Sequence, residues 1–209
     1  MNSFPIEPSV LAPFLVAVLL IELTPGPNMG YLAALSASQG IAAGFKAVLG
    51  VTAGLAFYML LAVLGIAEAI ATAPFVYGLL RWAGVFYLLY LAWEAWRGAS
   101  ETSPGHAKDV DHAPFLRGLI ANVLNPKALV FYVALLPGFV AADRAAFWVQ
   151  ALVLGSLHLA VSLLVHSGIV LGAARAGAVI ARSRNAVTVR RALAIGIVVI
   201  ALWLAWETR

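Results

Sequence analysis

Long apolar runs constrain the fold of this chain more than any other feature. Three of them, at residues 47–67, 75–93 and 147–174, are long enough to cross a membrane as helices. A helix needs about 20 mainly apolar residues to span the roughly 30 Å hydrocarbon core of a bilayer. A fourth run, at 192–206, is shorter, but arginines before it and tryptophans at its end suit the two membrane interfaces. Hydrophobic residues make up 63% of the 209 and charged residues only 11%, which excludes an ordinary water-soluble fold.

Two further apolar segments are interrupted by proline. Residues 9–38 contain Thr-Pro-Gly-Pro-Asn at positions 24–28, and residues 115–140 contain Asn-Pro-Lys at positions 125–127. Proline removes a backbone donor and clashes with the preceding helical turn, and glycine adds conformational freedom. We therefore predict an all-α membrane protein with six transmembrane helices, of which helices one and four are broken at proline.

The two breaks occupy corresponding positions in the chain. A shift of 101 residues, the difference between positions 24 and 125, aligns them and pairs Leu23 with Leu124, Thr24 with Asn125, Pro25 with Pro126, and Tyr31 with Tyr132. We therefore predict one transmembrane domain over residues 1–209. It comprises a three-helix repeat at 1–97, a cytoplasmic linker at 98–114 and a second three-helix repeat at 115–209.

Basic residues predict the orientation in the membrane. The connections on one side hold nine of them: Lys46, Arg97, Lys108, Arg117, Arg175, Arg182, Arg184, Arg190 and Arg191. The other side holds Arg144 and Arg209. The positive-inside rule then predicts a multi-pass protein of the cell inner membrane with both termini on the non-cytoplasmic side. Since each repeat has three spans, the second is inverted relative to the first, an architecture typical of transporters.

Several site classes lack their characteristic residues. The chain has no cysteine, so a disulfide framework and thiolate chemistry are excluded. His106, Asp109 and His112 lie in the polar linker, where we interpret them as solvated side chains rather than metal ligands. We expect no metal and no cofactor. We also expect no nucleic-acid partner, because the basic residues serve as topology signals.

The energy source and the N-terminus have their own sequence signals. No phosphate-binding Gly-x-x-x-x-Gly-Lys-Ser/Thr motif occurs, so energy comes from a gradient or from a separate subunit. Residues 1–8 carry no Lys or Arg, so we do not expect a signal peptide.

The motifs resemble those of a known family. They are the segment at 24–28, the glycines at 40, 44, 50 and 54, the Arg-Trp-Ala-Gly at 81–84, the Asn-Val-Leu-Asn-Pro-Lys at 122–127 and the Leu-Pro-Gly-Phe-Val at 136–140. In this order they are similar to the lysine exporter (LysE) superfamily, in its homoserine/threonine resistance (RhtB-like) branch. The resemblance implies amino-acid efflux coupled to the proton motive force. It leaves the particular amino acid open.

The breaks are the candidate substrate pathway. Lipid cannot satisfy the backbone groups that a break exposes, so such breaks persist inside protein or along a wet cavity. A proline kink that only improves packing is the alternative. The candidate substrate-binding residues are Thr24, Pro25, Gly26, Pro27, Asn28, Asn125, Pro126 and Lys127. Their amide groups and the freed N–H groups suit an ammonium and a carboxylate.

Charged and histidine side chains within the spans are candidates for coupling. Lys127 binds a substrate carboxylate, pairs with an acid such as Glu22, or extends to the interface. Glu22 and His158 are the proton-coupling candidates, with His166 as a further possibility. The structural alternative for Glu22 is a permanently paired charge, and for each histidine it is a hydrogen-bonded position in the core. We assign Arg81 a structural role.

Two local spacings carry structural expectations. Glu94 and Arg97 are three residues apart, which predicts an ion pair along one helix. Glycines four residues apart, at 50 and 54 and at 168 and 172, predict close helix packing.

The sequence thus predicts a secondary transporter that exports amino acids or related small metabolites by proton antiport, and not an enzyme. The alternatives are an exporter of another small solute or ion, and a non-transporting membrane assembly protein. The expected partners are a small-molecule substrate, an amino acid by resemblance, and the lipid bilayer. A homo-oligomer is left open.

Overall fold

All regular secondary structure is helical over the residues that the structure, a computed structural model, describes: 4–98, 113–181 and 186–207. In chain order the elements are α1 (Pro8–Leu23), α2 (Pro27–Gln39), α3 (Ile41–Val63), α4 (Ile66–Thr72), α5 (Pro74–Gly98), α6 (Ala113–Val123), α7 (Pro126–Val130), a π-helical turn η2 (Phe131–Leu135), a 3₁₀ turn η3 (Leu136–Phe139), α8 (Phe147–Ala181) and α9 (Ala186–Glu207).

The predicted spans are present. By length and composition, α3, α5, α8 and α9 can each cross a membrane. Two bent pairs bring the total to as many as six: α1 and α2 meet at 57°, and α6 and the segment Pro126–Phe139 meet at 55°. The all-helical class is therefore confirmed, and both bends fall at the predicted proline breaks. The inverted relation of the two repeats stays a prediction.

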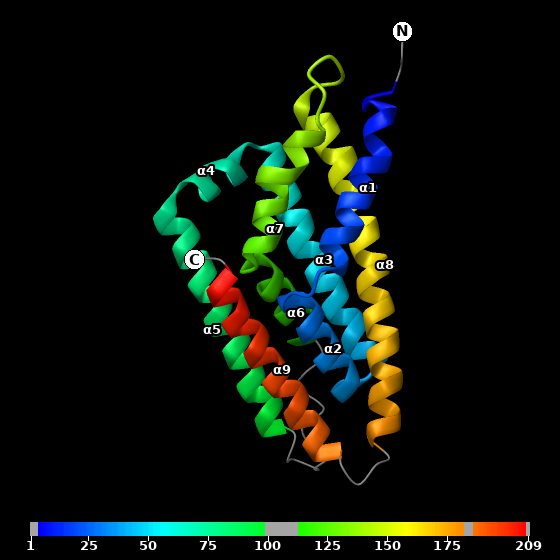
Figure 1. The fold of residues 1–209 in the computed structure, drawn as a ribbon, viewed down its shortest axis with the longest axis vertical. Coiled ribbons are helices and arrows are strands. Elements are labelled where there is room, and N and C mark those ends of the chain that lie inside the picture. The colour runs from blue at the N-terminus through cyan, green and yellow to red at the C-terminus, as the bar shows by residue number, and fades with distance from the viewer. Residues whose placement is uncertain (1–3, 99–112, 182–185, 208–209) are drawn as a thin grey trace.

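The two broken helices divide the molecule along its length (Figure 1). Helices α2 and α6 lie toward the end where α5 and α8 finish and α9 begins, whereas α1 and α7 lie toward the end that carries the N-terminus. The first of these ends corresponds to the predicted cytoplasmic side. Lys108, Arg182, Arg184 and Arg209 of the cation count, and the linker residues His106, Asp109 and His112, lie outside the described residues.

Small residues let α3 and α6 approach closely. A Cβ atom at Gly50 would lie 2.0 Å from the carbonyl oxygen of Phe115, and one at Gly54 would lie 2.7 Å from Nδ2 of Asn122. The predicted close packing is therefore confirmed for this pair. It is wrong for Gly168 and Gly172, around which the described atoms leave open space. Spacing alone does not say which helix face meets a neighbour.

Several helix boundaries differ from those predicted; α5 and α8, for example, extend to residues 98 and 181. Helix α3 ends at Val63 instead of residue 67, because Gly65 adopts a left-handed conformation (φ 71°) and starts the short helix α4, which the apolar pattern did not indicate. Helix α9 starts at residue 186 rather than 192, so Arg191 is within the helix, where its guanidinium lies 5.1 Å from the ring centroid of Trp96.

Candidate functional site

The first break, residues 24–26, is closed by a lysine from the other half of the chain. Pro25 has no N–H group, so the carbonyl of Ile21 loses the donor that a continuous helix would supply. The Nζ atom of Lys127 donates to that carbonyl at 2.5 Å and to the carbonyl of Thr24 at 3.0 Å. Lys127 therefore stabilises the exposed backbone of the first break.

The second break, residues 124–125, is closed by neutral groups. The side chain of Asn125 caps α7 by accepting a hydrogen bond from the backbone N–H of Lys127 at 3.0 Å. The hydroxyl of Tyr58, on α3, donates to the carbonyl of Val123 at 2.5 Å. Pro126 begins α7, just as Pro27 begins α2, so each restart has a proline where no donor is needed.

A pair of asparagines joins the two broken helices. Nδ2 of Asn28, on α2, donates to Oδ1 of Asn122, on α6, at 2.6 Å. Among the described residues, neither Oδ1 of Asn28 nor Nδ2 of Asn122 has a hydrogen-bond partner, and both atoms are buried. Leaving a buried polar atom unpaired costs about 1–3 kcal/mol. One acceptor and one donor are thus available to a ligand.

Asn122 was not among the predicted site residues, although its motif contributed to the family resemblance. A buried amide on an apolar membrane helix, three residues before Asn125, is the signal that could have identified it.

Glu22 lies in a buried chain of hydrogen-bonding groups. The carboxylate is 7% exposed and places Oε1 2.9 Å from Nε2 of His158 and Oε2 3.6 Å from Nε2 of His166. Tyr132 and Ser162 hold the other ring nitrogens, at 3.2 and 3.1 Å. The two histidines are eight residues apart on α8 and therefore share one face. The predicted candidates Glu22 and His158 are in direct contact.

This arrangement corrects the pairing suggested for Lys127. The carboxylate of Glu22 lies against the two histidines, whereas the lysine ammonium donates to backbone carbonyls.

The breaks, the amide pair and the histidines surround one small cavity. Its volume is about 30 Å³, which is room for about two water molecules and too little for an amino acid. Its lining includes Glu22, Gly26, Asn28, Asn122, Asn125, Lys127, His158 and His166. The structure therefore has no room for an amino acid where the broken helices meet α8, and we name this space the closed cavity. Thr24, Pro25, Pro27 and Pro126 shape the breaks without lining this cavity.

Other charged residues lie outside this cavity. Nη2 of Arg81 donates to the carbonyl of Ala205 at 2.6 Å and so joins α5 to the last turn of α9. The predicted pairing of Glu94 with Arg97 is wrong. Helix α6 brings Arg117 close to Glu94, so that Nη2 of Arg117 is 2.5 Å from Oε1 of Glu94. The guanidinium of Arg97 lies instead over the ring of Trp93. Within the described segments, no group of three or more His, Asp or Glu side chains is placed to hold a metal ion.

Comparison with known proteins assigns the family. The LysE type translocator model matches residues 19–208. The chain is 34% identical over 172 residues to an uncharacterised membrane protein of Pseudomonas aeruginosa, covering 77% of this chain and 80% of that protein. It is 32% identical over 177 residues to an uncharacterised membrane protein of Vibrio cholerae, covering 84% and 85%. It is also 38% identical over 131 residues to the leucine efflux protein of Salmonella typhimurium, covering 61% of each chain.

No solved structure matches the chain. The family match includes both breaks, the amide pair and both histidines. This multi-pass membrane protein therefore belongs to the LysE type translocator family.

Proposed function

We propose that this protein exports amino acids with apolar side chains, leucine being the first to test, across the inner membrane in exchange for protons. The observation that carries the proposal is the buried amide pair, Asn28 and Asn122, which joins the two breaks and leaves one acceptor and one donor unpaired. An amino acid presents a complementary ammonium donor and carboxylate acceptor. Similarity to a leucine efflux protein supports the same substrate class.

Lys127 is the proposed cationic partner of the substrate carboxylate. Its ammonium uses two of its three N–H groups on backbone carbonyls, which leaves one for a carboxylate. It borders the closed cavity, and it also borders a separate apolar pocket that Tyr77 and Trp203 line. A charge at bilayer depth costs about 2.5–3.5 kcal/mol unless it has partners. A ligand carboxylate is a suitable additional partner.

Glu22 is the proposed proton carrier. A carboxyl between two histidines can be neutral in a dry site and ionised when the site hydrates, so its protonation can follow the opening and closing of the cavity. Alternating access around a fixed site couples the proton to the substrate if both bind there. Glu22 and Asn28 line the same cavity, which supports a shared site for the proton and the substrate.

Transport into inside-out membrane vesicles tests both parts. With an acidic lumen, vesicles containing the protein are expected to accumulate labelled leucine, whereas vesicles without it are not. Glu22→Gln retains the shape of the side chain but cannot exchange a proton. The variant is expected to exchange labelled for unlabelled leucine while failing to accumulate it against a gradient.

The outcomes separate the alternatives. Accumulation by Glu22→Gln at the wild-type level would place the proton site elsewhere. If correctly inserted wild-type protein moves no amino acid from a panel of twenty, amino-acid export is wrong. A non-transporting assembly role or another solute would then be preferred.

The proposed orientation has an independent test, since the chain lacks native cysteine. Phe4→Cys, near the N-terminus, is expected to react with a membrane-impermeant thiol reagent in spheroplasts, and Gln39→Cys only after the membrane is opened. Both side chains are exposed. The reverse labelling pattern would contradict the positive-inside assignment and place the N-terminus in the cytoplasm.

A further inference from the structure

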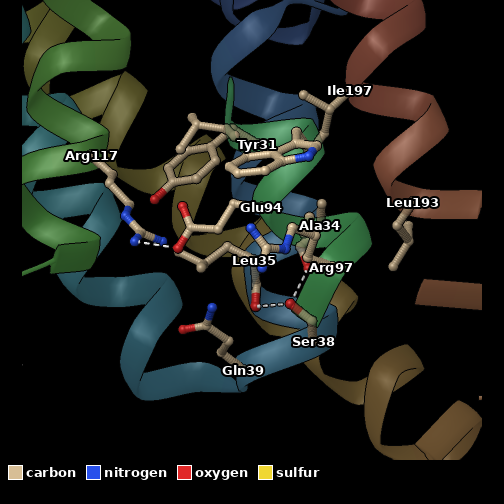
Figure 2. A pocket seen from close by; sticks show the side chains of 13 residues that line it. Tyr31, Ala34, Leu35, Ser38, Gln39, Glu94, Arg97, Arg117, Leu193 and Ile197 are labelled. Atoms are coloured by element: carbon tan, nitrogen blue, oxygen red, sulfur yellow. Dashed lines mark hydrogen bonds and ion pairs between the residues drawn. The ribbon is translucent and has the colours of Figure 1, made fainter. Parts of the chain in front are cut away.

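A second, larger cavity, drawn in Figure 2, lies at the predicted cytoplasmic end. Its volume is about 410 Å³, within the ~300–1,000 Å³ range of small-molecule pockets. Helices α2, α5, α6 and α9 contribute its walls. We name this cavity the vestibule; the lining residues that matter here are Tyr31, Leu35, Glu94, Arg97, Arg117 and Ile197.

The vestibule contains both signs of charge and two unpaired polar atoms. Oε1 of Glu94 is held by Arg117 at 2.5 Å, but Oε2 is buried and has no hydrogen-bond partner among the described residues. The buried hydroxyl of Tyr31 likewise has none in the described part of the chain. Figure 2 shows Tyr31, Glu94 and Arg117 directed toward one another. Buried polar atoms of this kind are costly unless a ligand or water meets them.

A second guanidinium borders the same space. Arg97 is exposed and lies 4.8 Å from the ring centroid of Trp93, and both residues line the vestibule. Apolar side chains, among them Leu35 and Ile197, form much of the remaining wall. A cation alone would bring no anion to Arg97, and an anion alone would leave Oε2 of Glu94 unpaired among the described residues. A zwitterion satisfies both groups.

The vestibule and the closed cavity share the same two helices. On α2, Asn28 lines the cavity and Tyr31 lines the vestibule, three residues or about 4.5 Å along the axis. On α6, Asn122 and Arg117 line the same two spaces, five residues or about 7.5 Å apart. A molecule that leaves the vestibule between α2 and α6 therefore arrives at the amide pair.

We propose that the vestibule is a loading site for a zwitterionic amino acid with an apolar side chain. Oε2 of Glu94 accepts from the substrate ammonium, and Arg97 with the Tyr31 hydroxyl donates to the carboxylate. Arg117 positions Glu94, and the apolar wall receives the side chain. The inference rests on the proposed export of amino acids and adds a recognition step on the cytoplasmic side, before the substrate reaches the central cavity.

Sided transport kinetics test the assignment. In inside-out vesicles the vestibule faces the bath, so leucine uptake there depends on it. Glu94→Gln is expected to raise the KM for uptake about tenfold, the effect of losing one charge-assisted hydrogen bond, with Vmax changed less than about twofold. In right-side-out vesicles, leucine entering from the opposite face should keep its wild-type KM. Glu7→Gln, which alters the ion pair with Arg144 at the other end of the molecule, is the matched control.

A charge-swapped variant separates a ligand role from a structural one. Glu94→Arg combined with Arg117→Glu retains an ion pair between α5 and α6 but moves the carboxylate. If the pair only holds these helices together, the double variant recovers the wild-type KM, and the proposal is wrong. If Glu94 binds the ammonium, KM stays raised. Tyr31→Phe, which breaks no ion pair, is expected to raise KM about threefold, as loss of a neutral hydrogen bond would.

Truncated leucine analogues test the zwitterion itself. 3-Methylbutylamine lacks the carboxylate and 4-methylpentanoate lacks the ammonium, and each is expected to inhibit uptake from the vestibule side at least about tenfold more weakly than unlabelled leucine. Equal inhibition by either analogue would contradict the loading site. If wild-type vesicles take up leucine and the Glu94→Gln variant has the wild-type KM, this inference alone is wrong. If wild-type vesicles take up no amino acid, the proposed function is wrong as well.

Discussion

The two breaks bend their helices by nearly the same angle, 57° and 55°, but they satisfy the exposed backbone differently. At the second break, Asn125 caps its own restarting helix and Tyr58 supplies a neutral hydroxyl. At the first break, the restarting helix α2 has no side-chain cap, and the carbonyls of Ile21 and Thr24 accept hydrogen bonds from the ammonium of Lys127. The first break thus depends on a charge that belongs to the second.

This difference shows that the halves are not equivalent copies. Neutral hydrogen bonds from Asn125 and Tyr58 satisfy the second break, whereas the first is held by a cation, a group that also attracts carboxylates. A ligand that draws Lys127 away would loosen the first break and leave the second unchanged. The unequal capping therefore predicts that the first break, rather than the second, responds to a ligand at Lys127.

Removal of the lysine is expected to have the largest effect on this comparison. Lys127→Ala removes the ammonium that donates to the carbonyls of Ile21 and Thr24, and it removes the proposed carboxylate partner. We expect leucine transport to fall at least about a hundredfold while the protein stays in the membrane, since two charge-assisted bonds are lost. Transport assays with quantified membrane protein measure this.

Lys127→Arg is the matched control for charge. A planar guanidinium cannot reproduce the compact ammonium between the two carbonyls, so little activity should return. Wild-type transport by Lys127→Ala would rule out any direct role and would make the two breaks equivalent.

The amide pair provides an intermediate effect. Asn28→Ala and Asn122→Ala are each expected to reduce transport about tenfold, because each removes a shared hydrogen bond and one unpaired group. Since the two side chains bond each other at 2.6 Å, the double variant should lose much less than the sum of the two free-energy losses. Additive losses in this double-mutant cycle would show that the pair does not act as a unit.

Loss of the neutral Tyr58 hydrogen bond at the second break is expected to have the smallest effect on transport. Tyr58→Phe removes the hydroxyl that donates to the carbonyl of Val123 and should lower the free energy of unfolding by about 1 kcal/mol. Transport should change less than about threefold, because no group that borders the closed cavity is lost. Thermal unfolding in detergent and transport assays on the same preparation measure both quantities. A transport defect as large as that of Lys127→Ala would contradict the difference between the breaks.

Much of the architecture could be predicted because it depends on local properties. Run length and apolar composition indicate spans, and Pro25 and Pro126 remove donors wherever the chain folds. The resemblance in motifs predicted the family that the comparison assigns. Helix α4 was not predicted, because its start depends on the backbone conformation of Gly65. The apolar pattern of a sequence does not indicate that conformation.

Side-chain pairing could not be predicted in the same way. Glu94 has Arg97 as a neighbour on its own helix, yet it pairs with Arg117, which α6 presents from 23 residues further along the chain. Glu22 and Lys127 were plausible partners by charge. In the structure, however, His158 contacts Glu22, and a backbone carbonyl accepts from Lys127. Opposite charge is a weak guide to pairing, because many arrangements satisfy it.

The sequence by itself determined that this chain crosses the membrane repeatedly and that two of its helices break, since both follow from the solvation of apolar surface and from the missing N–H of proline. Only the tertiary structure decided that Asn28 meets Asn122, that Glu22 lies against two histidines, and that Lys127 closes the opposite break. These contacts join residues from 94 to 136 positions apart. Hydrogen bonds act over about 3 Å, so which groups meet depends on how the helices pack.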